Sequence, residues 1–265
     1  MHPILFQFGW LKLPSYGLMV ASGYLAGIYY IFRKAEAAGL KKEDLSDLVF
    51  YSVLGGMLGA KLFYAATYWG SFGDSSADRF VYLLRNFRYG FVFYGGLIGG
   101  SAGFFLTARK KKMPWPRAAD VFAPALSLGH AFGRIGCFMA GCCYGSPTMC
   151  ALGVTFTDPA SEVNPRYLGV PVHPTQLYEA AGNIVIFLIL NAALNRTFKG
   201  KLPTGAVLGI YALLYSMLRF SLEFLRGDDR GNFTMGFSPA QILSGVVFTA
   251  AAVYICILKA RYEKK

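Results

Sequence analysis

Long apolar stretches separated by short polar segments dominate this chain. A helix needs about 20 mostly apolar residues to cross a membrane. Seven stretches of about that length occur, at residues 16–32, 48–68, 91–108, 118–139, 177–194, 204–224 and 239–258. No Gly-rich or Ser-rich linker, low-complexity tract or clear internal repeat divides the chain. The pattern predicts an all-α integral membrane protein with seven transmembrane helices, forming a single polytopic domain over residues 1–265.

The composition agrees with this class. Hydrophobic residues make up 55% of the chain and charged residues 15%, whereas about a quarter of the residues in soluble proteins are charged. The formal net charge of +12 could indicate binding to nucleic acid. Its distribution along the chain favours a different interpretation, because the basic residues alternate from loop to loop.

Four basic residues lie between residues 33 and 47, five between 109 and 117, three between 195 and 203, and four after residue 258. The alternate segments hold seven, namely Lys12, Arg79, Arg85, Arg88, Arg166, Arg226 and Arg230. Cytoplasmic loops of membrane proteins collect Lys and Arg. We therefore expect the N-terminus outside, the C-terminus in the cytoplasm and no nucleic-acid partner.

The fourth apolar stretch carries polar residues on one helical face. Asp120, Ser127, His130, Arg134 and Cys137 recur at helical spacing. A charged residue at the centre of a membrane costs about 2.5–3.5 kcal/mol on insertion scales, so it is usually functional or paired. Arg134 is therefore the strongest single candidate for a functional site, with an ion pair to a neighbouring helix as the alternative. His130 fits a buried structural histidine as well as a catalytic one.

Further candidates lie at the outer ends of the first and third predicted helices. Tyr16 opens the first helix, where an aromatic membrane anchor is the simpler interpretation. Tyr94 stands beside Gly95 and Gly96 in the third. Paired glycines remove side chains from one stripe of a helix, so either a neighbouring helix or a lipid headgroup can approach its backbone.

The fifth and sixth helices add polar residues at the same side of the membrane. His173 and Gln176 lead into the fifth helix, where capping explains them nearly as well as substrate binding. Arg219 and Glu223 share a face of the sixth helix and can neutralise each other. Even a paired charge at that depth indicates a cavity lined by protein. With Arg134, the site would hold two arginines, which suit bidentate binding of a phosphate, and we expect a phospholipid headgroup as the ligand.

Cysteines are unusually dense near the end of the fourth stretch, at Cys137, Cys142, Cys143 and Cys150. They do not follow the Cys-x-x-Cys repeat of a structural zinc site, so we expect no metal and no cofactor. A disulfide on the oxidising outer side or simple packing of a small buried side chain explains them better.

Five motifs carry a family resemblance. They are Tyr-Gly-Leu-Met from Tyr16, Gly-Gly-Leu-Ile-Gly from Gly95, Gly-Arg-Ile-Gly-Cys-Phe from Gly133 with its continuation to Gly145, His-Pro-Thr-Gln-Leu-Tyr-Glu from His173, and Arg-Phe followed by Glu-Phe-Leu-Arg from Arg219. In this order, across nearly the whole chain, they resemble the prolipoprotein diacylglyceryl transferase family. The Gly-Arg-x-Gly and His-Pro-x-Gln-Leu-Tyr-Glu motifs are specific.

The resemblance implies a multi-pass enzyme of the bacterial cytoplasmic (inner) membrane with its active site towards the outer leaflet. It would transfer the diacylglyceryl group of phosphatidylglycerol to the lipobox cysteine of a prolipoprotein signal-peptide segment, forming a thioether and releasing glycerol phosphate. Its partners would be these two substrates and membrane lipid. Arg134 and Arg219 would bind the phosphate and stabilise the charge that develops on the leaving group.

Other residues take roles by the same resemblance. Tyr16 and Tyr94 join the two arginines as catalytic residues. The substrate-binding residues would be Arg134, Arg219, Glu223, Gly145, Gly95, Gly96, Cys137, Cys142, His173 and Gln176. Members of the family carry histidine, asparagine and glutamate where Tyr94, Cys137 and Cys142 stand here. A phenol with a pKa near 10 is a poor base at neutral pH, so we expect Tyr94 to orient a substrate or donate a hydrogen bond.

Two other functions fit part of the pattern. A transporter or flippase for an anionic lipid or solute would also carry charges within the membrane, but the candidate residues lie on one side and no inverted repeat is visible. A different headgroup enzyme would require a cluster of metal-binding carboxylates. Asp228 and Asp229 offer little support for that alternative.

Overall fold

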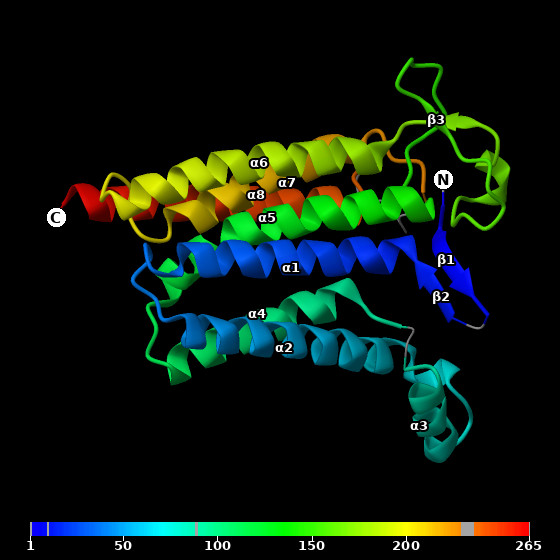
Figure 1. Ribbon diagram of the computed structural model, residues 1–265, viewed down its shortest axis with the longest axis horizontal. Coiled ribbons are helices and arrows are strands. Elements are labelled where there is room, and N and C mark those ends of the chain that lie inside the picture. Colours follow the sequence, from blue (N-terminus) through cyan, green and yellow to red (C-terminus); the bar gives the residue numbers. More distant parts are fainter. Residues whose placement is uncertain (1, 10, 88–89, 229–235, 265) are drawn as a thin grey trace. The chain divides into compact units, whose positions relative to one another are not determined.

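The computed structural model describes residues 2–9, 11–87, 90–228 and 236–264. Its helices are α1 (Ser15–Ala35), α2 (Lys42–Tyr68), α3 (Ser76–Arg85), α4 (Phe93–Lys110), α5 (Trp115–Ala140), α6 (Thr175–Phe198), α7 (Ala206–Glu223) and α8 (Pro239–Glu263) (Figure 1). Its strands are β1 (Ile4–Phe8), β2 (Leu11–Pro14), β3 (Val154–Thr155) and β4 (Pro171–Val172). Arg88, Asp229 and Arg230, which entered the charge and acidic-pair arguments above, lie outside the described residues.

Each of the seven predicted apolar stretches coincides with a helix to within a few residues. The segments Lys42–Ser71, Thr175–Phe198, Ala206–Glu223 and Pro239–Glu263 are long and apolar enough to cross a membrane. The prediction of a helical membrane protein is therefore confirmed. Crossing of the membrane by α1, α4 and α5, and the orientation of the termini, stay predictions.

The structure adds elements that the apolar pattern does not reveal. Helix α3 is short and amphipathic, and the Ser75 hydroxyl caps it by accepting a hydrogen bond from the Asp78 amide at 3.2 Å. Strands β1 and β2 form an antiparallel hairpin before α1. Strands β3 and β4 pair in the segment that joins α5 to α6. A search for stretches of membrane length misses all of these elements, because each is short.

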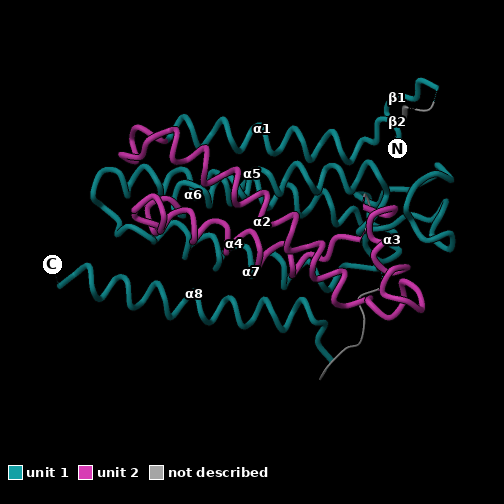
Figure 2. The backbone as a smooth tube through the Cα atoms, turned by 90° about the horizontal axis from the view of Figure 1, so that it is seen from below, with its two compact units in different colours: residues 1–34, 119–265 teal, residues 35–118 magenta. Residues whose placement is uncertain are grey.

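The chain divides into two compact units (Figure 2). Unit 1 contains residues 1–34 and 119–265, and unit 2 contains residues 35–118. Unit 1 therefore holds α1, α6, α7, α8 and nearly all of α5, while α2, α3 and α4 belong to unit 2. The single domain expected from the sequence stays a prediction.

Glycines join the two long helices of unit 2. A Cβ atom added at Gly59 would collide with the carbonyl oxygen of Gly95, and one added at Gly99 would collide with that of Gly55. The backbones of α2 and α4 can touch because these positions lack side chains. The packing interpretation of the paired glycines is thus confirmed for Gly95. Substrate binding by Gly95 and Gly96 stays a prediction.

The helices of unit 1 alternate in direction (Figure 1). The last turns of α1 and α6 meet where the Lys34 ammonium donates to the Asn195 side chain at 3.1 Å. The first turns of α5 and α7 meet at the same end, where the Asp120 carboxylate accepts from the Gly205 amide at 2.6 Å and from the Leu208 amide at 3.0 Å. The opposite end collects the β1–β2 hairpin, the end of α5 and the starts of α6 and α8.

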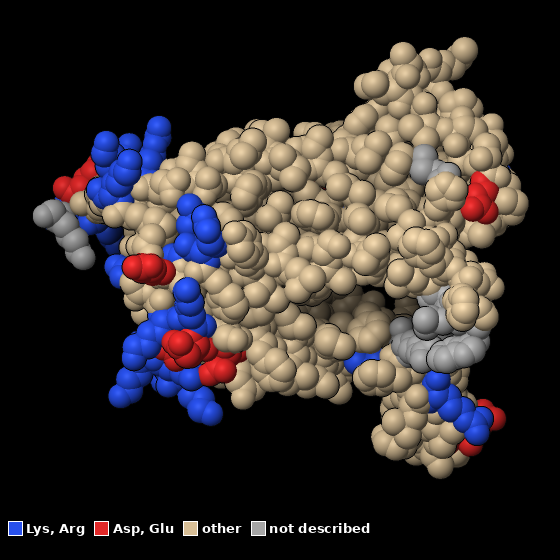
Figure 3. Space-filling model, in the orientation of Figure 1, with Lys and Arg blue, Asp and Glu red and all other residues tan. Residues whose placement is uncertain are grey.

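Basic residues mark one end of unit 1. The last turns of its three helices that run in the same direction contain Arg33 and Lys34 in α1, Arg196 in α6 and Arg261 in α8. On the face that Figure 3 shows, the Lys and Arg side chains of unit 1 gather at the end where the chain terminates. The site described below lies at the other end.

Candidate active site

The polar face of α5 contacts α6 and α7, as the sequence predicted for a side that avoids lipid. At the start of the helix Asp120 binds the first turn of α7. Further along, the buried Ser127 hydroxyl donates to the Asn183 carbonyl oxygen of α6 at 2.8 Å. In the next turns His130 and Arg134 approach Glu179 of α6. Contacts to both neighbouring helices thus follow one face of α5 along most of its length.

Two buried Arg–Glu pairs form the centre of the candidate site. The Nε atom of Arg134 lies 3.1 Å from Oε2 of Glu179. Arg219 contacts Glu223 one turn later on α7. Both glutamate side chains are only 2% exposed, whereas those of Arg134 and Arg219 keep 15% and 17% exposure. Each arginine is therefore held by a buried carboxylate while part of its side chain remains accessible.

Glu179 contacts several side chains besides its partner in the first pair. We did not predict it as a site residue. Besides Arg134, its carboxylate accepts a hydrogen bond from the Tyr215 hydroxyl at 3.3 Å and lies 3.6 Å from Nε2 of His130. The ring of His130 also packs against Tyr215. A signal was available in the sequence, because a carboxylate inside a predicted membrane helix requires a cationic or hydrogen-bonding partner.

Glu223 ties the second pair to the start of α8. The Ser238 hydroxyl donates to Oε1 of Glu223 at 2.7 Å. Ser238 and Gln241 form a capping box, with the Ser238 amide donating to Oε1 of Gln241 at 3.0 Å. The prediction that Arg219 and Glu223 neutralise each other is also confirmed.

Tyr16 reaches the site because α5 has a glycine in the Gly-Arg-Ile-Gly motif. A Cβ atom added at Gly136 would lie 3.1 Å from the ring of Tyr16 and 3.1 Å from Cβ of Met19. The first turn of α1 thus packs closely against the last turns of α5. Tyr16 is 46% exposed and is an electrostatic neighbour of both Arg134 and Cys137.

Backbone hydrogen bonds fix the loop after α5. The Gly145 amide donates to the His173 carbonyl oxygen at 2.8 Å, and the Ser146 amide donates to the Leu225 carbonyl oxygen at 2.8 Å. Gly145 also forms a β-bridge with Arg226. The loop therefore lies between the segment that leads into α6 and the segment that follows α7, and it joins the ends of three helices.

Gly145→Ala is expected to destabilise this junction. A Cβ atom at position 145 would lie 2.6 Å from Cβ of His173 and 2.6 Å from the carbonyl oxygen of Leu225. Overpacking of this kind costs about 1–3 kcal/mol, which thermal unfolding in detergent would measure as a lower midpoint. Gly70→Ala is the matched control, because its Cβ atom would meet nothing within 4 Å. Equal midpoints for both variants would contradict the packing argument.

Gln176 and His173 have partners within the protein. The buried Gln176 side chain donates from Nε2 to the Cys142 carbonyl oxygen at 2.7 Å, and the neighbouring Thr175 hydroxyl donates to the Cys143 carbonyl oxygen at 2.9 Å. Nδ1 of His173 lies 3.5 Å from the Tyr178 hydroxyl. These contacts position the loop after α5. Substrate binding by Gln176 and His173 stays a prediction.

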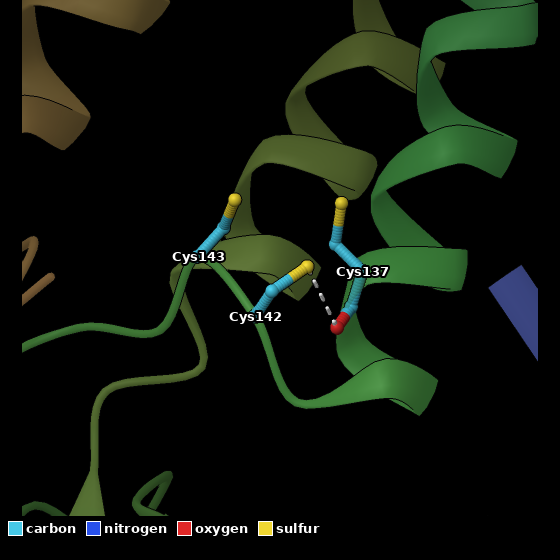
Figure 4. A group of neighbouring side chains, drawn as sticks. All are labelled: Cys137, Cys142 and Cys143. Atoms are coloured by element: carbon cyan, nitrogen blue, oxygen red, sulfur yellow. Dashed lines mark hydrogen bonds between the residues drawn. The ribbon is translucent and has the colours of Figure 1, made fainter. Parts of the chain in front are cut away.

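Three cysteines come together beside the Arg134 turn. The sulfur atoms of Cys137, Cys142 and Cys143 all lie within 4.8 Å of one another (Figure 4). Cys137 comes from the last turn of α5, and the other two come from the loop that follows it. All three thiols are free. A role for Cys137 and Cys142 in substrate binding stays a prediction.

Arg226 adds a third guanidinium at this end of unit 1. Its Nε atom donates to Oδ1 of Asp228 at 2.9 Å, and its side chain is 8% exposed. Burial by itself would lower the pKa of Arg226, but the hydrogen bond to Asp228 and the neighbouring Cys143 raise this pKa above its ordinary value. The guanidinium therefore stays charged at any physiological pH.

Tyr94 belongs to unit 2, where it lies in the first turn of α4 and is 45% exposed. The sequence predicts that it lies beside the two arginines. That position stays a prediction, as does its catalytic role. Gly95 and Gly96 also lie in unit 2, whereas the other predicted site residues belong to unit 1: Tyr16, Arg134, Cys137, Cys142, Gly145, His173, Gln176, Arg219 and Glu223. Tyr215 connects the two Arg–Glu pairs, because it interacts electrostatically with both Arg134 and Arg219.

Comparison with known families agrees with the motifs. A family model described as prolipoprotein diacylglyceryl transferase matches residues 3–257. The chain belongs to this family. The resemblance stated from the five motifs is thereby confirmed, and so is the membership in a class of transferases. The two Arg–Glu pairs and the loop at Gly145 are thus features of a prolipoprotein diacylglyceryl transferase family member.

Several curated relatives share most of their length with this chain. A protein of Clostridium tetani named phosphatidylglycerol–prolipoprotein diacylglyceryl transferase is 35% identical over 245 residues, covering 92% of this chain and 92% of the relative. A Clostridium perfringens protein of the same name, numbered 2, is 33% identical over 96% of this chain and 94% of its own length. A Geobacter sulfurreducens protein of that name is 35% identical over 93% and 91%.

Proposed function

We propose that this protein transfers the diacylglyceryl group of phosphatidylglycerol to the thiol of the lipobox cysteine in a prolipoprotein signal peptide. Membership in the family and the names of the relatives support the two substrates. The observation that carries the proposal is the pair of partly exposed arginine side chains, Arg134 and Arg219, each held by a buried carboxylate.

This arrangement suits recognition of a lipid phosphate. Arg134 meets Glu179 through Nε, so the N–H donors of its two terminal nitrogens can point at a ligand. A guanidinium that is already fixed by a carboxylate loses little conformational freedom when a phosphate binds. Arg219, fixed by Glu223, offers a second cation of the same kind. Both charges act in surroundings with little water, where their attraction for a phosphate is stronger.

At the attacked carbon the transfer forms one bond and breaks one. The sulfur of the lipobox cysteine attacks the carbon of the diacylated glycerol that carries the phosphate ester, a C–S bond forms and the bond from that carbon to the phosphate oxygen breaks. The electron pair of that bond leaves with glycerol phosphate, and the thiol proton ends on the phosphate or in solvent. Arg134 and Arg219 stabilise the charge that grows on the leaving phosphate. Tyr16, which is exposed beside Arg134, donates a hydrogen bond to the same group.

The acyl chains of the lipid have a groove in unit 1. A depression of about 890 Å³ lies between α7 and α8. Its lining is almost wholly apolar and includes Phe220, Phe237, Ile242, Val246, Val253 and Ile257. Gln241 lies at the same groove and binds Ser238, which binds Glu223. The groove therefore begins next to the Arg219–Glu223 pair. If Arg219 binds the phosphate of a lipid, the acyl chains of that lipid can lie in the groove.

We place the protein in the bacterial cytoplasmic membrane as a multi-pass chain with seven spans, the N-terminus outside and the C-terminus in the cytoplasm. The basic last turns of α1, α6 and α8 support this orientation, because positive loops stay in the cytoplasm. The site lies at the other end of these helices. It would therefore open towards the outer leaflet, the side on which a lipobox cysteine would meet it.

The test uses purified full-length protein in detergent micelles that contain phosphatidylglycerol. A peptide with a lipobox cysteine is expected to gain the mass of one diacylglyceryl group, through a thioether that resists alkaline hydrolysis. The same peptide with serine in place of cysteine, and micelles of phosphatidylethanolamine alone, should give no product. Absence of product with phosphatidylglycerol would contradict the proposal. Movement of unmodified lipid across proteoliposomes would then support the transporter alternative.

A further inference from the structure

The proposed transfer does not account for the three cysteines that converge beside Arg134. Their sulfur atoms lie within 4.8 Å of one another, and none forms a disulfide (Figure 4). In the described residues they are the one group of three or more His, Cys, Asp or Glu side chains that could surround a metal ion. Cys150 and Cys256, the other two cysteines, are exposed and lie outside this group.

The backbone holds the two loop cysteines in place. The Cys142 amide donates to the Cys137 carbonyl oxygen at 3.1 Å, which turns the chain back at the end of α5. The carbonyl oxygens of Cys142 and Cys143 accept from Gln176 and Thr175 of α6. Cys143 has a φ of +60°, a left-handed conformation that costs energy in a residue with a side chain. This conformation persists because hydrogen bonds on both sides determine it.

The spacing of the sulfurs fits a thiophilic cation. Thiolates bind Zn²⁺ at about 2.3 Å, which puts sulfur atoms of a tetrahedral site about 3.8 Å apart. The sulfur atoms of this group, all within 4.8 Å of one another, are at most about 1 Å farther apart than such a site requires. Three protein ligands with an open fourth position are the arrangement of reactive zinc sites, whereas purely structural sites have four.

The surrounding charges suit such a complex. Three thiolates and one divalent cation carry a net charge of −1. Cys143 interacts electrostatically with Arg226 and Arg134. Both guanidinium groups stabilise a negative complex. Cys137 lies in the last turn of α5, where the negative end of the helix dipole favours a cation. The guanidinium groups therefore stabilise the thiolates, and the C-terminal end of α5 stabilises the cation.

We propose that Cys137, Cys142 and Cys143 bind one thiophilic metal cation of the Zn²⁺ class, with a fourth position open to water or to a thiol from outside the protein. The spacing of the cysteines in the sequence predicted no metal, because none of them is separated from the next by two residues. The fold supplies what the spacing lacks, since the turn after α5 brings Cys142 and Cys143 back to Cys137. The geometry that supports this site does not depend on the diacylglyceryl transfer, so the site would stand if that proposal failed.

The test titrates Co²⁺ into full-length protein that has been purified in detergent under reducing conditions. We expect a sulfur-to-cobalt charge-transfer band that saturates at one ion per chain and disappears when Zn²⁺ is added. Cys142→Ser and Cys143→Ser should each lose the band. Cys150→Ser and Cys256→Ser, which change cysteines outside the group, should keep it. Thermal unfolding of each variant shows whether it is folded.

X-ray absorption of the unmodified protein loaded with Zn²⁺ gives a second measurement that needs no variant. Three sulfur neighbours at about 2.3 Å are expected. The proposal is overturned if the first shell holds only oxygen or nitrogen, or if the Co²⁺ band is absent. It is also overturned if the band survives in both Cys142→Ser and Cys143→Ser. A disulfide within the group, found by peptide mapping of freshly reduced protein, would also overturn the proposal. It would show that two of the cysteines form a redox pair and not a metal site.

Discussion

Arg134→Gln is expected to lower the rate of diacylglyceryl transfer about 10²- to 10³-fold, the usual effect of removing one donor that stabilises charge in a transition state. Glutamine keeps a polar side chain of intermediate length but carries no positive charge. The reaction would end with a phosphate that leaves as an anion, and Arg134, which is held by Glu179, is one of the two guanidinium groups that we propose to bind it. The rate is measured as product formed on a lipobox peptide under saturating phosphatidylglycerol.

Two further variants separate charge from geometry at this position. Arg134→Lys keeps the charge but loses the planar fork that binds two phosphate oxygens, so its rate should fall between those of the wild type and Arg134→Gln. Arg166→Gln is the matched control, because Arg166 is an exposed loop residue of the same unit. A full rate in Arg134→Gln, or an equal loss in Arg166→Gln, would remove Arg134 from the phosphate site.

Glu179→Gln is expected to lower the free energy of unfolding by about 3–5 kcal/mol, the typical cost of removing one partner from a buried ion pair. Glutamine has nearly the same shape and can still accept the hydrogen bond from Tyr215. It cannot neutralise Arg134, whose side chain is only 15% exposed. Denaturation in detergent measures the change, and Glu162→Gln, which alters an exposed loop glutamate of unit 1, is the control.

The double variant Arg134→Gln with Glu179→Gln tests whether the two residues act as a pair. Removing both charges leaves no unpaired ion, so the double variant should be more stable than the sum of the two single losses predicts. Its transfer rate should stay as low as that of Arg134→Gln. The double variant regains stability, but it still lacks the positive charge of Arg134 that stabilises the leaving phosphate. Additive losses of stability would show that the two side chains do not interact in the folded protein.

The coupling between Arg134 and Glu179 also changes how the candidate site is understood. From the sequence we expected two arginines together around a phosphate. The structure places each arginine on its own carboxylate and links those carboxylates to Tyr215 and Ser238. Such an arrangement lowers the net charge of the site. It also keeps both guanidinium groups in one orientation, which favours binding by preorganisation rather than by attraction alone.

Much of this organisation could be predicted because it depends on local properties of the chain. Helices of membrane length follow from apolar runs, and the stripe of polar residues on α5 follows from helical periodicity. The paired glycines Gly95 and Gly96 of α4 indicated that a neighbouring helix or a lipid headgroup can approach the backbone, because side chains are absent there. The family was recognised from motifs around Arg134, His173 and Arg219, whose order along the chain requires no knowledge of the fold.

The sequence by itself therefore determined the helices, the faces of those helices that avoid lipid, and the family to which the chain belongs. Only the tertiary structure decided which residues meet. Periodicity assigns Arg134 to a face but does not say which helix lies opposite, so the pair with Glu179 depended on how α5 and α6 pack. The cysteines met for a similar reason. Three thiols without a zinc spacing converge because a turn with a left-handed residue, held by hydrogen bonds from α6, reverses the chain.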